Sequence, residues 1–470
     1  MYVIIGAGPS GLSLAYLLKK NGYDVTLIEK ENEIGGCHKV KRVGGYFTEH
    51  GPRIYLNNYL TTISLLNDMK IDFNQLFTPY KFQLSNIGGQ SLSHFTLKEM
   101  FLLTINYLLF SINKKHTRQI TMAEFMDKNN FTNDAKDYVD RLCRLTDGAG
   151  SDRYTLYEFY ELMNQNMLYT VYQPKIANDK GLFKLWRNKL EEIGVNILLN
   201  TKVDKLVLND KETTIKSVIT NKGEIKGDKF ILALPPDNII KILENSGDNR
   251  IRNSFGNFND FQIWTEQTEY ITYVPITFHW KKKIDLPKIY GFPKTSWGLA
   301  FIVLSDYMDM SNEPSKTLIS SAITITNKKS EKTGKTADES NYGELLDEAL
   351  RQLMISFPDL PKPDKIILSP GVKRIGNKWY STDEAFVLTK NGYMDNRSKL
   401  INNLYNVGTQ NGKSNYAFTS MESAVQNAVN LLQTEFGINY GIRNGWTVNQ
   451  LLVFICVLLF YLIYLLKTYM

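Results

Sequence analysis

The sequence predicts an α/β protein with a parallel-sheet unit at its start, an interleaved mixed-sheet and helical region, and an apolar helix near residue 450. Three observations lead to this prediction. A short apolar strand, Tyr2–Ile5, runs into a glycine-rich loop and then into a helix-like segment with Leu and Ala on one face. Segments rich in β-branched and aromatic residues recur between 269 and 326, as is typical of strands. Residues 448–466 carry no charge.

The loop after the first strand has the G-x-G-x-x-G spacing of a dinucleotide-binding turn. It reads Gly6-Ala7-Gly8-Pro9-Ser10-Gly11, and a second strand, Val25–Ile28, ends in Glu29. Glycines at this spacing let the backbone approach a pyrophosphate, and the N-terminus of the following helix attracts its negative charge. The acid at the end of the second strand is placed to accept the ribose hydroxyls. The order of strand, loop, helix, strand and acid therefore predicts a dinucleotide site.

The residues that follow resemble the FAD-dependent amine oxidase superfamily, which includes monoamine and polyamine oxidases, phytoene-type desaturases and protoporphyrinogen oxidases. A Gly35-Gly36 pair comes shortly after Glu29, and residues 49–53 read Glu-His-Gly-Pro-Arg, most like protoporphyrinogen oxidases. The order of helix and strands over 181–236 and the segment 403–428 are also similar to the family. The resemblance extends to about residue 435.

The resemblance implies a Rossmann-like FAD-binding domain and a set of cofactor-binding residues. Beyond Gly6, Gly8, Ser10, Gly11 and Glu29, the positions that match are Lys30, Gly35, Gly36, His38, Gly51, Pro52, Arg53, Val203, Gly408, Met421 and Glu422. The family usually has Arg directly after the Gly-Gly pair, whereas this chain has Cys37-His38-Lys39, so His38 or Lys39 is expected to supply the positive charge. No Cys precedes the last glycine-containing segment, so the FAD is expected to be non-covalent.

The two expected domains are each formed from segments that are separate in the sequence. The FAD-binding domain is predicted to comprise residues 1–75, 180–245 and 365–440, and the substrate domain residues 76–179 and 246–364. Residues 446–467 are predicted to form a transmembrane anchor.

The activity that the resemblance implies is oxidation of a lipophilic small molecule by hydride transfer to flavin N5. Without a second G-x-G-x-x-G for a nicotinamide, oxygen or a quinone-like compound is the expected electron acceptor. Trp379, Tyr416 and Ser420 are candidates for the substrate pocket, with core packing as the alternative for the first two, and no catalytic side chain is assigned. Ser420 stands where monoamine oxidases carry a cage Tyr, which weakens the amine-oxidase interpretation. A redox-neutral flavin isomerase resembling UDP-galactopyranose mutase and an inactive flavin-binding protein are the alternatives.

Composition and net charge limit which partners and sites are expected. The 470 residues are 43% hydrophobic, enough to bury a full core, and the net charge of +7 is spread without a basic run, so no nucleic-acid partner is expected. Three Cys cannot build a disulfide framework, and the five His lack metal-ligand spacing, so no metal site is expected.

The uncharged run at 448–466 is long enough to cross a bilayer, and Trp446 and Lys467 flank it. It predicts a single-pass anchor for a membrane protein with its catalytic domain on the cytosolic side. A second apolar segment, 100–112, is predicted to be a core helix, with a membrane-dipping face as the alternative.

Overall fold

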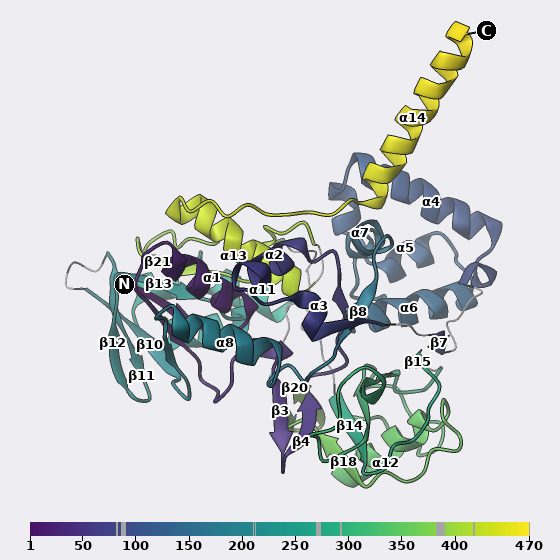
Figure 1. Ribbon diagram of the computed structural model, residues 1–470, viewed down its shortest axis with the longest axis horizontal. Helices are drawn as coiled ribbons and strands as arrows, with labels where there is room; N and C mark the ends of the chain where they lie inside the picture. Colours follow the sequence, from purple (N-terminus) through teal and green to yellow (C-terminus); the bar gives the residue numbers. More distant parts are fainter. Residues whose placement is uncertain are drawn as a thin grey trace.

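The computed structural model describes residues 1–80, 83–85, 91–209, 211, 213–268, 274–291, 294–381, 390, 392–416 and 419–469. It has two sheet-based parts, a helical part and one projecting helix (Figure 1). The sequence also predicts strand structure at residues 269–273 and 382–388, and both segments lie outside these ranges.

The first part is built on a five-stranded parallel sheet in the order β21-β13-β1-β2-β9. Its strands are β1 (Tyr2–Ile5), β2 (Val25–Ile28), β9 (Asn196–Leu198), β13 (Lys229–Leu232) and β21 (Leu404–Asn406). β1 and β2 are buried along their whole length, which explains their continuous apolar sequences. The predicted α/β class and Rossmann-like arrangement are confirmed.

Helices and a second small sheet cover the two faces of this parallel sheet. One core cluster joins it to α1 (Pro9–Lys20), α2 (Leu60–Asp68), α8 (Leu182–Glu192) and α13 (Met421–Phe436). Another cluster joins it to α9 (Pro236–Asn245), α10 (Asn249–Arg252), α11 (Phe258–Glu266) and the antiparallel sheet of β10 (Val203–Leu208), β11 (Ile215–Thr220) and β12 (Gly223–Lys226). Residues 249–266 were expected in the substrate domain, but their apolar side chains pack on this part instead.

The second part is a six-stranded mixed sheet in the order β18-β14-β17-β16-β15-β7. Its strands are β7 (Gln83–Ser85), β14 (Val274–Trp280), β15 (Ile289–Gly291), β16 (Leu299–Val303), β17 (Thr317–Ile323) and β18 (Lys365–Leu368). The apolar face of α12 (Tyr342–Leu353) packs against it. β18 was expected within the FAD-binding domain, but it pairs antiparallel with β14, so the polypeptide stays in this sheet beyond residue 364.

Short strands connect the two parts. The hairpin of β3 (Val40–Val43) and β4 (Tyr46–Glu49) turns at Gly44 and Gly45, which have φ of +58° and +83° and so fit a type I′ turn. The others are β5 (Tyr55–Leu56), β6 (Phe77–Pro79) and β8 (Val171–Pro174), and the hairpin of β19 (Val372–Ile375) and β20 (Lys378–Ser381). The short helix α3 (Phe73–Leu76) precedes β6.

The helical part comprises α4 (Leu97–Ile112), α5 (Met122–Lys128), α6 (Asn133–Asp147) and α7 (Leu156–Asn166). Three of these helices begin with the same signal, because Thr96, Thr121 and Thr155 each form a capping box with a Glu three residues later. Their inner faces share one core cluster.

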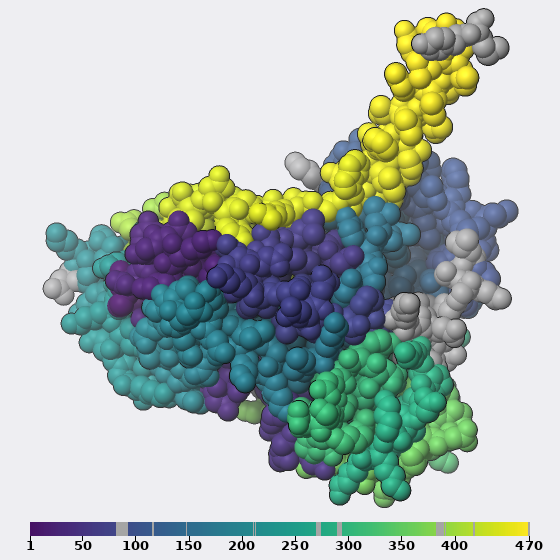
Figure 2. All heavy atoms as spheres, in the orientation of Figure 1, coloured from purple at the N-terminus to yellow at the C-terminus, as the bar shows by residue number. Residues whose placement is uncertain are grey.

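α14 (Val448–Tyr469) projects away from the rest of the chain (Figure 2). Residues Val448–Thr468 have a mean hydropathy of 2.5, and none of the most apolar stretch is buried. Among the described residues, this is the one helix that is long and apolar enough to cross a membrane.

Candidate functional site

The glycine-rich loop lies at the carboxyl end of β1, where only glycine fits. Gly6 has φ of +106°, and a Cβ there would lie 2.3 Å from the carbonyl oxygen of Ala233. A Cβ on Gly11 would lie 2.0 Å from the carbonyl oxygen of Gly6. The loop is therefore packed tightly against the end of β13, and α1 begins directly after it with Pro9 in its first turn. This arrangement presents the helix N-terminus to a phosphate group.

The second glycine pair closes against the first loop. Gly36 has φ of +58°, and a Cβ there would lie 3.0 Å from the Cα of Gly8. Gly35 has φ of +115°, and a Cβ there would lie 2.7 Å from the ring of Phe183 in α8. Side chains at these positions would push the two backbone segments apart, so the pair forms a bare backbone wall beside the loop.

Glu29 holds the loop from the neighbouring strand. Its carboxylate accepts hydrogen bonds from the backbone N–H of Ala7 at 2.8 Å and of Glu31 at 3.1 Å. The side chain is largely buried, yet it lines the same cleft as the glycines. The acid predicted from sequence spacing is therefore beside the phosphate loop, where a ribose would lie in a dinucleotide site.

These elements border a cleft of about 380 Å³. Ten of the residues that the sequence predicted to bind the cofactor or the substrate line it: Gly6, Gly8, Ser10, Glu29, Lys30, Gly36, His38, Val203, Gly408 and Ser420. Further polar lining residues, which no sequence motif predicted, include Thr201, Lys202, Asn238, Lys241, Thr409, Gln410 and Thr419. Gln410 also donates a hydrogen bond to the carbonyl of Leu234 at 3.1 Å, which ties the last segment of the site to the end of β13.

The other predicted residues lie outside this lining. They are Gly11, Gly35, Gly51, Pro52, Arg53, Met421, Glu422, Trp379 and Tyr416. Gly11 and Gly35 shape the two loops from behind, and Arg53 donates a hydrogen bond to the carbonyl of Cys37, next to the cleft. Their roles as cofactor or substrate contacts stay predictions.

Glu422 has a structural partner of its own. Its carboxylate accepts hydrogen bonds from the N–H groups of Thr61 at 2.9 Å and Thr62 at 2.8 Å, and from the Thr62 hydroxyl at 2.6 Å. Gln426 donates a fourth bond at 2.9 Å. The carboxylate therefore caps the first turn of α2, while burial raises its pKa. The N-terminus of α13 borders the cleft through Ser420 and Ala424 instead.

Trp379 and Tyr416 are both buried in cores. The indole N–H of Trp379 donates to the carbonyl of Ala337 at 3.0 Å within the cluster around α12. The hydroxyl of Tyr416 donates to the carbonyl of Asn58 at 3.2 Å within the cluster around α2. Their place in a substrate pocket stays a prediction, whereas Ser420 lines the cleft and accepts a capping hydrogen bond from the N–H of Ser423.

Two basic candidates replace the Arg that the family carries after Gly36. Burial lowers the pKa of His38 well below 6.5, and nearby Arg53 and His50 lower it further. This burial disfavours the charged form of His38. Lys39, which also lines the cleft, is the better source of positive charge toward a pyrophosphate.

A buried polar group lies behind His38, at the end of β4. Burial raises the pKa of the Glu49 carboxyl to about 7, although a hydrogen bond from Ser320 at 2.6 Å and the charge of Arg53 both lower it. His50 is also buried, and one of its ring nitrogens lies 3.2 Å from the Ser381 hydroxyl. Sequence reasoning quoted Glu49 and His50 as part of a motif but gave them no role, because their partners come from β17 and β20.

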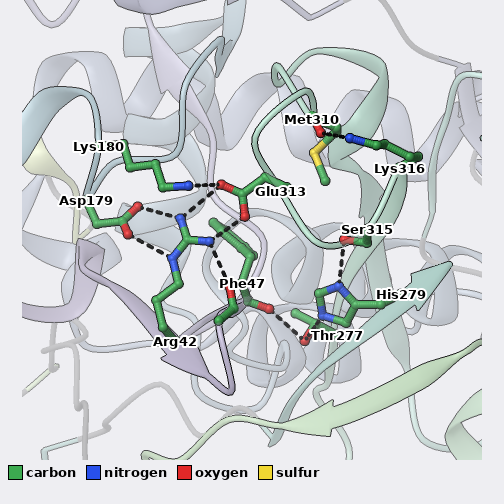
Figure 3. A network of polar contacts seen from close by, with 11 residues as sticks. Arg42, Phe47, Asp179, Lys180, Thr277, His279, Met310, Glu313, Ser315 and Lys316 are labelled. Carbon is green, nitrogen blue, oxygen red and sulfur yellow. Dashed lines mark hydrogen bonds and ion pairs between the residues drawn. The ribbon is translucent and has the colours of Figure 1, made fainter. Parts of the chain in front are cut away.

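Arg42 fastens the β3–β4 hairpin to two other segments (Figure 3). Its guanidinium contacts both oxygens of Asp179, at 2.8 and 3.0 Å, and also Glu313, which Lys180 contacts at 2.7 Å. Burial alone would raise the pKa of Glu313, but these cations lower it. Nearby, His279 in β14 contacts the hydroxyls of Thr277 and Ser315 at 3.1 Å, and burial lowers its pKa to about 4. Arg42 thus fixes the β3–β4 hairpin, which carries Glu49 at the end of β4.

The residues of the cleft fit a dinucleotide cofactor. Gly6, Gly8 and Gly36 border the cleft with bare backbone, and the α1 N-terminus and Lys39 complement a pyrophosphate. Glu29 supplies an acceptor for ribose hydroxyls, and the cleft continues to Gly408 and Ser420 at the start of α13. A cleft that reaches from β2 to α13 suits an extended molecule bound along the carboxyl edge of the sheet.

The chain is similar to several known proteins. Residues 4–68 match the family model described as an NAD(P)-binding Rossmann-like domain. The chain is 38% identical over 76 residues to 1-hydroxycarotenoid 3,4-desaturase from Flavobacterium sp., covering 16% of each chain. It is 23% identical over 268 residues to a probable flavin-containing monoamine oxidase A from Dictyostelium discoideum, covering 50% of this chain and 57% of that protein. These similarities support membership of the FAD-dependent amine oxidase superfamily, whose members bind FAD.

The similarity of fold extends over most of the chain. An oxidoreductase from Methanosarcina mazei aligns with a TM-score of 0.64 at 13% identity, covering 92% of this chain and 100% of that one. Wild-type putrescine oxidase bound to putrescine aligns with a TM-score of 0.62 at 14% identity, covering 91% and 96%. The sequence matches are shorter, since they span from 16% to 57% of these two curated relatives.

Proposed function

We propose that the protein is a membrane-anchored oxidoreductase that oxidises a lipophilic small molecule with non-covalently bound FAD. The observation that carries this proposal is the cleft walled by Gly6, Gly8 and Gly36, with Glu29 beside it. The uncharged run 448–466 in α14 supports the membrane part, because its apolar side chains are exposed along its length.

The chain's own residues bind and orient the cofactor. The α1 N-terminus and Lys39 hold the pyrophosphate, Glu29 holds a ribose, and the start of α13 lies at the other end of the cleft. When bound, FAD would supply a hydride acceptor at N5, and oxygen or a quinone-like compound would be the final electron acceptor.

Anaerobic reduction of the bound flavin tests the proposed activity. The purified full-length protein in detergent is mixed with amines, carotenoid precursors and porphyrinogens in turn, and flavin absorbance is followed in the absence of oxygen. We expect one lipophilic class to bleach the flavin at a rate that depends on its concentration. Dithionite reduction without bleaching by any of these compounds would contradict the proposed activity.

A redox-neutral flavin isomerase is the second candidate. It is favoured by 31% identity over 95 residues to UDP-galactopyranose mutase from Mycoplasma pneumoniae, which covers 24% of that protein. This candidate predicts that dithionite-reduced protein interconverts UDP-galactopyranose and its furanose isomer with no net oxidation, whereas the oxidoreductase leaves the nucleotide sugar unchanged.

A further inference from the structure

The base of α14 is attached to the helical part of the protein by hydrogen bonds within its first turn. The N–H of Asn449 donates to the Asn164 side chain in α7 at 3.0 Å, and the Ser111 hydroxyl in α4 donates to the Asn449 side chain at 3.0 Å. The Tyr169 hydroxyl donates to the carbonyl of Trp446 at 2.9 Å. The point where the apolar run begins is therefore fixed against α4 (Figure 1).

α4 has apolar side chains on two faces. On the inner face, Phe110 is fully buried, and Leu102 and Leu103 pack against the core cluster of the helical part. On the outer face, six apolar side chains recur every three or four residues, so they form a stripe along the helix. They are Leu97 (83% exposed), Phe101 (64%), Ile105 (38%), Leu108 (49%), Leu109 (49%) and Ile112 (84%).

The outer stripe carries no carboxylate. The acid of α4, Glu99, is turned inward and accepts hydrogen bonds from the N–H groups of Thr96 and Thr132. Lys98 is exposed beside Leu97 at the start of the helix. The stripe therefore combines exposed apolar side chains with a cation and no exposed acid, which suits an anionic or zwitterionic lipid surface.

Other exposed apolar residues continue this surface toward α14. Met167 is 68% exposed and Leu168 is 42% exposed, and both directly precede Tyr169, which contacts Trp446. Trp446 is itself 58% exposed. Tryptophan at the start of a membrane span is typical of the interface between headgroups and hydrocarbon. The outer stripe and these three residues therefore lie at the level where α14 would enter a bilayer.

We propose that the outer stripe of α4 lies in the interface of the bilayer that α14 crosses, so that the protein rests on the membrane through two elements. This inference rests on the membrane span in the proposed function. If α14 is embedded from about Leu451 onward, Asn449 lies at the headgroups, and Ser111 of α4 must lie there too. Contact with lipid would then cover a continuous apolar surface that is otherwise exposed to water. A helix attached at the base of a span also restricts the tilt of the whole protein on the membrane.

Photolabelling from within the bilayer tests this contact. The full-length protein is reconstituted into phosphatidylcholine vesicles that contain a diffusible hydrophobic carbene reagent, and labelled residues are mapped by mass spectrometry. We expect label on α14 and on Phe101 and Leu108. The controls are Ile263 in α11 and Ile375 in β19, which are 51% and 63% exposed. Label on α4 should exceed label on these controls about tenfold, because the reagent concentrates in hydrocarbon.

A matched pair of variants separates lipid contact from general reactivity. Phe101→Asn combined with Leu108→Asn should lower the label on the rest of α4 while label on α14 is unchanged, whereas Ile263→Asn should alter neither. Label on α14 but not on α4 would overturn this inference and leave the proposed anchor intact. Absence of label from both helices would refute the anchor and this inference together. Protection of α4 by a second copy, seen as a disulfide-linked dimer of Phe101→Cys with α4 unlabelled, would also overturn it.

Discussion

Replacement of Glu29 is expected to weaken FAD binding with little effect on the fold. The carboxylate contacts two backbone N–H groups, of Ala7 and Glu31, and borders the cleft where a ribose would lie. Hydrogen bonds to a charged group contribute about 1.5–3 kcal/mol. At about 1.4 kcal/mol for each factor of ten, this raises the dissociation constant of FAD about ten- to a hundredfold.

Two substitutions at this position should differ in a defined order. Glu29→Gln keeps one oxygen that can accept a hydrogen bond from Ala7, so its dissociation constant for FAD should rise about tenfold. Glu29→Ala also loses both backbone contacts, so its dissociation constant for FAD should rise about a hundredfold. Titration of the apoprotein with FAD, followed by flavin fluorescence, measures the effect. Glu31→Gln is the control, because that carboxylate has only a 3.9 Å ion pair with Lys30. Unchanged FAD affinity in Glu29→Ala would refute the assigned role.

Three further outcomes are expected. Glu422→Ala should lower the free energy of unfolding by about 3 kcal/mol, because it leaves two buried N–H groups of α2 without their acceptor. Denaturant titration with saturating FAD measures this change. An unchanged unfolding midpoint would contradict the capping role of Glu422. Burial raises the pKa of Glu49 from 4.5 to about 7, so the unfolded chain releases this proton first, and stability should fall as pH rises from about 4.5 to about 7. Glu49→Gln should remove that fall, worth about 3 kcal/mol, from melting curves at pH 5 and pH 8; identical pH profiles would show that the carboxyl is not held protonated. Deleting residues 448–470 should move the protein from the membrane to the soluble fraction with flavin retained, because α14 lies outside the cleft; loss of flavin would mean that this helix supports the fold.

Features set by neighbouring residues could be predicted from the sequence. The unit of β1, the glycine loop, α1 and β2 is local, and each part has its own signal in strand composition, loop glycines and a terminal acid. α12 (Tyr342–Leu353) has a regular apolar period, which is visible in the sequence alone. The three Thr-x-x-Glu capping boxes of the helical part are local signals of the same kind.

Features that depend on distant partners could not be predicted. Glu422 was expected near the cofactor because of its motif, but its acceptor atoms are bound by Thr61 and Thr62, about 360 positions away in the chain. The raised pKa of Glu49 depends on burial against β17, which no local pattern reveals. Likewise, 249–266 has an ordinary amphipathic pattern, and only tertiary packing shows that it belongs with the parallel sheet.

We propose that the cleft between β1, β2 and α13 binds FAD without a covalent bond. Acid precipitation of the purified full-length protein, followed by mass spectrometry of the supernatant, tests it most directly. The account predicts a yellow protein whose colour passes entirely into the supernatant as intact FAD. A colourless native protein, or flavin that stays with the precipitate, would contradict it.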